Sequence, residues 1–83
     1  MDAQQSSRLK RPINEMPKEV ASALKRRRLD TAYRERAAYQ QNDYLGWIAR
    51  AKRPETRERR LAQMLDELAA GDAYMGMRWR PRG

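Results

Sequence analysis

Two apolar stripes with helical spacing constrain this chain more than any other feature of its sequence. Each stripe places residues at positions i, i+3, i+4 and i+7, which share one face of an α-helix that has to be buried. The stripes consist of Tyr44, Trp47, Ile48 and Ala51, and of Leu61, Met64, Leu65 and Leu68. We therefore predict two packed helices over about residues 40–52 and 54–70, with Pro54 at the first position of the second helix and Gly71 just beyond its end.

Two shorter helices are predicted before these stripes. Pro17 suits a helix start, and Val20, Ala23 and Leu24 follow it on one face. Asp30 can cap the start of a second short helix.

In that second helix we expect Tyr33 to turn toward the core. Arg34, Glu35 and Arg36 are expected to face water.

The length of the chain allows one domain with one modest core. Of its 83 residues, 40% are hydrophobic and 36% charged, which is polar for a globular domain but sufficient for folding. We predict an all-α fold, a small bundle of three to four helices over residues 16–80. Residues 1–15 are expected to form a disordered basic tail, because they contain few large apolar groups, and residues 81–83 to fray.

The segment after Gly71 carries a different pattern. Met75, Met77 and Trp79 alternate with small or polar residues, which is typical of extended backbone. Since no second strand is apparent elsewhere in the sequence, we predict a C-terminal strap that lies across the helices.

The composition argues against catalysis. The chain has no histidine and no cysteine, so it lacks the commonest general base, thiolate nucleophiles and the usual transition-metal ligands. No phosphate-binding glycine loop and no converging pair of carboxylates is apparent. We predict no catalytic residues, no metal site and no cofactor, and hence a protein that is not an enzyme.

A net charge of +8 predicts attraction to anionic partners. The strongest candidate surface surrounds the predicted start of the helix at Pro54, where free backbone amides already favour anions. It consists of Lys52, Arg53, Thr56, Arg57 and Arg60. The alternative is a charged turn in which Glu55 neutralises its neighbours.

A secondary basic patch follows the first predicted helix and consists of Lys25, Arg26, Arg27 and Arg28. Cations near a helix C-terminus interact favourably with the helix dipole, which explains the run without any ligand. An anion-binding patch is the alternative.

Residues 44–60, YLGWIARAKRPETRERR, resemble the C-terminal motif of the YdeI/OmpD-associated bacterial family, approximately E-Y-x-x-W-I-x-x-A-K-x-x-E-T-R-x-x-R. The similarity extends over about residues 16–71 and departs from the family at residues 37–43 and 74–77. It implies a bacterial helical module connected with bacteriocin protection and outer-membrane-protein regulation. The family positions that it implies are Tyr44, Trp47, Ile48, Ala51, Lys52, Glu55, Thr56, Arg57 and Arg60, with Tyr33 as a preceding aromatic.

Together these observations predict a binding or regulatory module that contacts a protein or a small anionic ligand. Nucleic-acid binding through the basic clusters is the alternative. Because the sequence has no apolar stretch long enough to span a bilayer and no hydrophobic signal core, we expect a cytoplasmic protein. The small core leaves a homodimer open.

Overall fold

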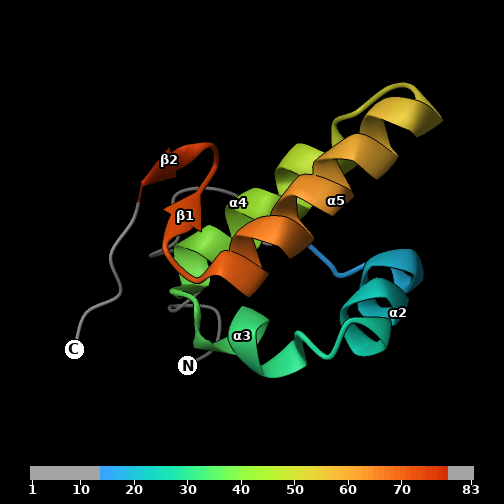
Figure 1. Cartoon of the computed structure of the whole chain (residues 1–83). Coiled ribbons are helices and arrows are strands. Elements are labelled where there is room, and N and C mark those ends of the chain that lie inside the picture. The colour runs from blue at the N-terminus through green and yellow to red at the C-terminus, as the bar shows by residue number, and fades with distance from the viewer. Residues whose placement is uncertain (1–13, 79–83) are drawn as a thin grey trace, which may run out of the picture.

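A computed structural model describes residues 14–78 and contains, within that range, four helices and one short hairpin (Figure 1). The helices are α2 (Lys18–Arg26), α3 (Asp30–Glu35), α4 (Ala38–Ala49) and α5 (Pro54–Ala70), and the strands are β1 (Ala73–Tyr74) and β2 (Met77–Arg78). The all-α class with four helices is thus confirmed. No helix in residues 14–78 is long and apolar enough to cross a membrane.

Helices α4 and α5 form a helical hairpin, as the two apolar stripes predict (Figure 1). The bounds of α5 are as predicted: Pro54 is its first residue, and Gly71 follows its end with a left-handed φ of 85°. Helix α4 begins two residues earlier and ends three residues earlier than expected. Arg53, the residue before Pro54, is extended, as expected of a residue before proline, and it separates α4 from α5.

The start of α3 differs from the prediction. Leu29 occupies the capping position and Asp30 is already helical, with no side-chain hydrogen bond to the helix start. The preceding turn explains this shift: Leu29 N–H donates to the Leu24 carbonyl at 2.9 Å, and Arg28 N–H donates to the Lys25 carbonyl at 3.1 Å. These two bonds form a Schellman motif that ends α2 and leads directly into α3.

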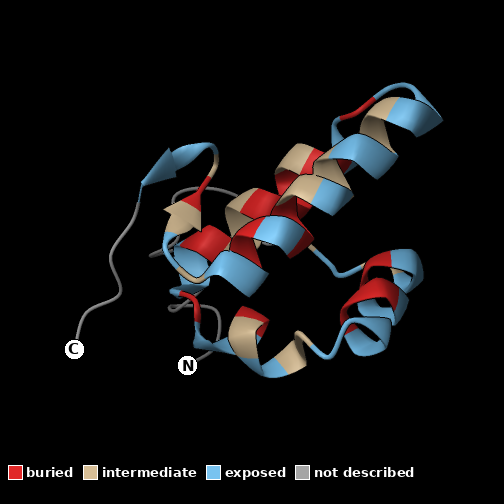
Figure 2. Cartoon of the chain, in the orientation of Figure 1, coloured by how far each residue is buried: buried red, intermediate tan, exposed pale blue. Residues whose placement is uncertain are grey.

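One buried cluster joins the helices (Figure 2). Six of the eight residues predicted to form the core are buried, namely Tyr33, Tyr44, Ile48, Met64, Leu65 and Leu68. Trp47 and Leu61 are half-buried and pack against this cluster. Helix α2 contributes the predicted face of Val20, Ala23 and Leu24, each at most 3% exposed.

The prediction that Arg36 faces water is wrong. Arg36 is 5% exposed, and its Nη2 donates to the carbonyl oxygens of Glu67 at 3.1 Å and Ala73 at 2.8 Å. Arg36 follows Tyr33 by three residues, so it continues the buried side of α3 past the helix end. Its long side chain carries the charge to the Glu67 carbonyl, which also accepts the Gly71 N–H at the end of α5, and to the Ala73 carbonyl in β1.

The C-terminal segment is a hairpin, and the expected single extended strap is corrected accordingly. Strands β1 and β2 pair antiparallel with Tyr74 opposite Met77. Met75 and Gly76 both have positive φ, 54° and 79°, as a tight hairpin turn of the primed type requires. The strand therefore finds its partner in the next residues along the chain, while Trp79 and residues 81–83 lie outside the described range.

The predicted N-terminal tail lies outside the described residues as far as position 13. Its last part is anchored, since the Asn14 N–H donates to Oδ1 of Asn42 at 2.6 Å. A Cβ added at Gly46 would lie 2.9 Å from Nδ2 of Asn14. Gly46 therefore allows the chain before α2 to approach α4 closely.

Candidate functional site

The predicted basic surface lies at the turn between α4 and α5. Lys52 and Arg53 are exposed, whereas Thr56 and Arg57 are half-buried on the first turn of α5. Among residues 14–78, neither Lys52, Arg53 nor Arg57 makes an ion pair or a side-chain hydrogen bond. Glu55 is exposed and likewise makes no ion pair within that range. The turn thus presents cations that have no partner of opposite charge in the described part of the chain.

Arg60 is placed differently from the other members of the predicted surface. Its Nη1 donates to the Trp47 carbonyl oxygen at 2.7 Å, and its guanidinium lies 5.2 Å from the centre of the Trp47 ring. This combination of a charge-assisted hydrogen bond and a cation–π contact fastens α5 to α4. Arg60 is therefore part of the helix interface.

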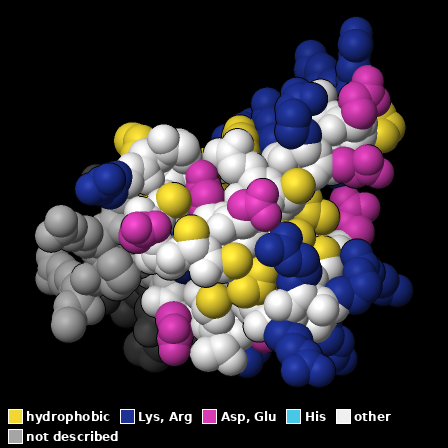
Figure 3. All heavy atoms as spheres, in the orientation of Figure 1, with side chains coloured by type: hydrophobic (Ala, Val, Ile, Leu, Met, Phe, Trp, Pro, Cys, Tyr) yellow, Lys and Arg dark blue, Asp and Glu magenta, His cyan; other side chains and the backbone are white. Residues whose placement is uncertain are grey.

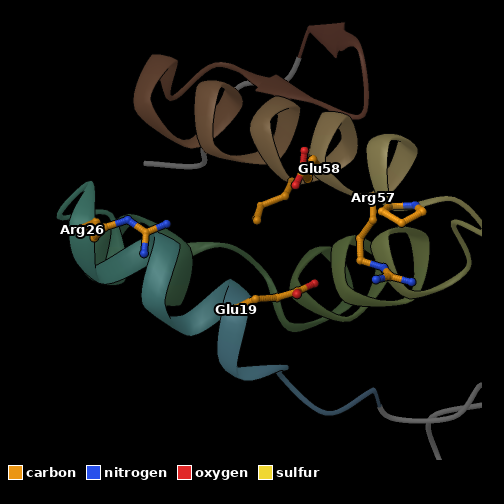
Figure 4. Close-up of a pocket in the computed structure, with 6 residues that line it drawn as sticks. Glu19, Arg26, Arg57 and Glu58 are labelled. Carbon is orange, nitrogen blue, oxygen red and sulfur yellow. The ribbon is translucent and has the colours of Figure 1, made fainter.

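A pocket of about 440 Å³ lies between α2 and the first turns of α5 (Figure 4). It is lined by Glu19, Arg26, Pro54, Arg57, Glu58 and Leu61. Figure 4 shows Glu19 and Arg26 on the α2 side, and Arg57 and Glu58 on the α5 side. The fold thereby brings one arginine from each predicted basic cluster to the same pocket, whereas Lys52, Arg53, Thr56 and Arg60 are not among its lining residues.

All four residues of the secondary basic patch are exposed. Arg27 Nη1 lies 3.3 Å from Oδ1 of Asp66, with side chains 43% and 73% exposed, and such surface pairs contribute little stability. Arg28 has a left-handed φ of 57° at the end of α2. The patch therefore has one weak link to α5, while Lys25 and Arg28 are exposed and Arg26 lines the pocket.

A polar cluster that was not predicted from the sequence surrounds the buried carboxylate of Glu67. This carboxylate accepts hydrogen bonds from the Tyr44 hydroxyl, from Nε2 of Gln63 at 3.1 Å, and from the N–H groups of Met75 at 2.8 Å and Gly76 at 2.7 Å. We call these five residues the Glu67 cluster. It joins α4, α5 and the hairpin turn.

The hydrogen bonds of the Glu67 cluster shift the pKa values of its members. Burial alone would raise the pKa of Glu67, but the bonds donated by Tyr44, Gly76, Met75 and Gln63 outweigh burial and lower it. For Tyr44, burial and the bond to Glu67 both raise the hydroxyl pKa. Glu67 therefore stays ionised inside the fold.

Helical spacing could have pointed to Glu67, because it lies three residues after Met64 and directly before Leu68, on the buried side of α5. What the cluster can do is structural, since both carboxylate oxygens are occupied by donors from the fold. No group of three or more acidic residues that could hold a metal ion occurs in the described part of the chain.

Comparison with known proteins places most of this fold in one family. The model of the OmdA family, described as bacteriocin-protection, YdeI or OmpD-associated, matches residues 14–71, which is more than half of the chain. The matched range runs from the anchored Asn14 through the end of α5 at Gly71 and excludes the hairpin. No curated protein and no solved structure matches the chain.

Proposed function

We propose that this chain, which belongs to the OmdA (YdeI or OmpD-associated) family, is a non-enzymatic binding module that contacts an anionic group of a protein or small ligand. The contact surface of the proposal is the α4–α5 turn with Lys52, Arg53, Thr56 and Arg57. Arg60 holds α5 against α4 next to this surface, through its hydrogen bond to the Trp47 carbonyl and its cation–π contact with the Trp47 ring.

One observation carries the proposal: Lys52, Arg53 and Arg57 surround the start of α5 without any ion pair among residues 14–78. The start of α5 also has no side-chain cap, so its first backbone amides remain available to an anion. Cations held near free amides at a helix start favour carboxylates and phosphates. A partner that supplies a carboxylate or a phosphate would pair with these cations and would accept hydrogen bonds from the free amides.

The test is charge reversal at two positions of the surface. The Arg53→Glu/Arg57→Glu variant, used as bait in native cell extract, should lose the partners that the unchanged protein retains. A matched control is Arg34→Glu/Arg78→Glu, which alters two exposed arginines on α3 and β2. Each pair lowers the net charge from +8 to +4, because every reversal removes two charges.

Circular dichroism should give the same helical spectrum for both variants. If the surface variant keeps its partners, or if the control loses them equally, the α4–α5 turn is not the contact surface.

Nucleic-acid binding is the second candidate, favoured by the net charge and by the exposure of Lys25, Arg26 and Arg28 on the end of α2. Such binding weakens steeply with salt, because each phosphate contact releases counterions. A DNA and an RNA duplex titrated into the protein should show affinities that fall as NaCl rises. Absence of binding at low salt would eliminate this candidate.

A further inference from the structure

The lining of the pocket between α2 and α5 combines charged side chains of both signs with apolar ones. Space-filling atoms show hydrophobic side chains between α5 and α2, flanked by Lys/Arg and Asp/Glu side chains (Figure 3). The lining contains two arginines and two glutamates, Arg26, Arg57, Glu19 and Glu58. Its charges therefore cancel, although the whole chain carries +8.

The four charged side chains of the lining have no partner within the described part of the chain. Among residues 14–78, Glu19, Arg26, Arg57 and Glu58 form neither ion pairs nor side-chain hydrogen bonds. Opposite charges that line one pocket without pairing are available to a ligand. Leu61 and Pro54 add apolar surface to the same lining.

The arrangement of the charges selects among ligands. A dianion would be attracted by Arg26 and Arg57 but repelled by Glu19 and Glu58. A dication would be attracted by the two glutamates but repelled by the two arginines. A ligand that carries one positive and one negative charge can place each charge near a side chain of the opposite sign. On α2, Glu19 and Arg26 are seven residues apart, which corresponds to about 10 Å along the helix axis, so a ligand that pairs with both needs a stem between its two charges.

We propose that the pocket between α2 and α5 binds a small zwitterion, in which a carboxylate and an ammonium or guanidinium group are joined by a short apolar stem. The stem would lie on Leu61 and Pro54. This inference rests on the proposed function, because Arg57 belongs both to the proposed contact surface and to the pocket. It names the class of ligand that would bind there.

The experiment compares three probes with the same five-methylene stem. These are 6-aminohexanoate with both charges, heptanedioate with two carboxylates, and 1,5-diaminopentane with two ammonium groups. Each is titrated into the full chain while amide signals are followed by NMR. We expect 6-aminohexanoate to shift signals of the pocket residues with a dissociation constant about fivefold below that of either analogue, the ratio that corresponds to one favourable surface ion pair.

Single substitutions then locate the site. Arg57→Gln should weaken 6-aminohexanoate binding and move the preference toward 1,5-diaminopentane, whereas Glu58→Gln should move it toward heptanedioate. Arg59→Gln and Glu35→Gln remove the same charges from exposed positions outside the pocket lining and should leave the preference unchanged.

Four outcomes would overturn the inference. Tightest binding of heptanedioate would make the pocket a plain anion site, which leaves the proposed function standing without its zwitterion. Tightest binding of the diamine, or no shift with any probe, would remove the zwitterion site, and the charge-reversal pull-down would still decide the proposed function independently. Shifts that survive both Arg57→Gln and Glu58→Gln would place binding elsewhere.

Discussion

At the scale of single residues, Arg28 occupies a position that suits glycine better. It is the left-handed residue of the Schellman motif after α2, with a φ of 57°. A residue with a Cβ is strained in this conformation, whereas glycine adopts it readily. Arg28 thus lowers stability at the very residue that sets the direction of the chain from α2 to α3.

We predict that Arg28→Gly raises the free energy of unfolding by about 0.5–1 kcal/mol, because it relieves that strain. Urea unfolding followed by circular dichroism measures the change. Lys25→Gly is the control, since a glycine inside the last turn of α2 should instead cost about 1 kcal/mol. Equal destabilisation by both substitutions would show that the backbone at Arg28 is not strained.

Glu67 is the residue whose charge matters most for stability. Its pKa is lowered in the folded state, so its ionised form stabilises the fold at pH values above the pKa of an unfolded glutamate, about 4.3. That stabilisation is lost as the pH falls through the lower, folded-state pKa. Glu67→Gln should therefore cost about 1.5–3 kcal/mol at neutral pH, the range for hydrogen bonds to charged groups, and flatten the loss of stability below pH 4.5.

Unfolding of the two proteins by urea at a series of pH values between 3 and 7 measures both effects. Asp66→Asn is the matched control, because Asp66 is the exposed neighbour of Glu67 on α5. If Asp66→Asn changes the pH profile as much as Glu67→Gln, the hydrogen bonds to the hairpin turn do not lower the pKa of Glu67.

At the scale of elements, Arg36 connects three segments that are distant in sequence. It follows α3, its Nη2 reaches the Glu67 carbonyl in α5 and the Ala73 carbonyl in β1, and its Nη1 donates to Oε1 of Gln40 in α4 at 3.4 Å. Its planar guanidinium offers five N–H donors in a fixed fork, whereas a lysine offers three donors on a single nitrogen. The hairpin is thus held from one side by Arg36 and from the other by Glu67.

We predict that Arg36→Met costs about 2–4 kcal/mol, because it removes the donor of the Ala73 carbonyl and leaves the Glu67 carbonyl with the Gly71 N–H alone. Thermal or urea unfolding measures this loss. Arg34→Met, an exposed substitution two residues earlier, should change stability by less than about 0.5 kcal/mol. A similar small effect at both positions would show that water replaces the guanidinium at no cost.

Some elements could be predicted from nearby residues in the sequence, whereas contacts between distant residues could not. The bounds of α5 could be predicted because Pro54, the apolar stripe and Gly71 all act within a few residues of chain. Arg36 could not be placed in the same way, since its partners lie 31 and 37 residues away. The hairpin was missed for a related reason: its turn begins with Met75, a residue that seldom has a positive φ, and Glu67 supplies the bonds that hold it.

The residues of the candidate site could likewise be predicted only in part from the sequence. Its exposed members, Lys52 and Arg53, could be identified from charge and from the expected helix start. The positions of the other members depend on tertiary packing. Helices α2 and α5 bring Arg26 and Arg57 to one pocket, and the Trp47 carbonyl accepts a hydrogen bond from Arg60. No spacing along the chain contains that information.

At the scale of the whole molecule, the net charge of +8 sets how stability responds to salt. At an ionic strength of about 0.01 M the screening length is about 30 Å, so cations across a domain of this size repel each other. At about 0.1 M it is about 10 Å, and most of that repulsion is screened. We predict that the free energy of unfolding rises over this range of NaCl concentration.

The Arg34→Glu/Arg78→Glu variant separates screening from anion binding. Its net charge of +4 is half the original value, and because overall self-repulsion grows roughly as the square of the charge, its stability should rise with salt by about a quarter as much. The Arg53→Glu/Arg57→Glu variant has the same net charge and should behave alike if screening alone operates. A rise that persists in the first variant and disappears in the second would instead show chloride bound at the α4–α5 turn, where Lys52, Arg53 and Arg57 have no ion pair within residues 14–78.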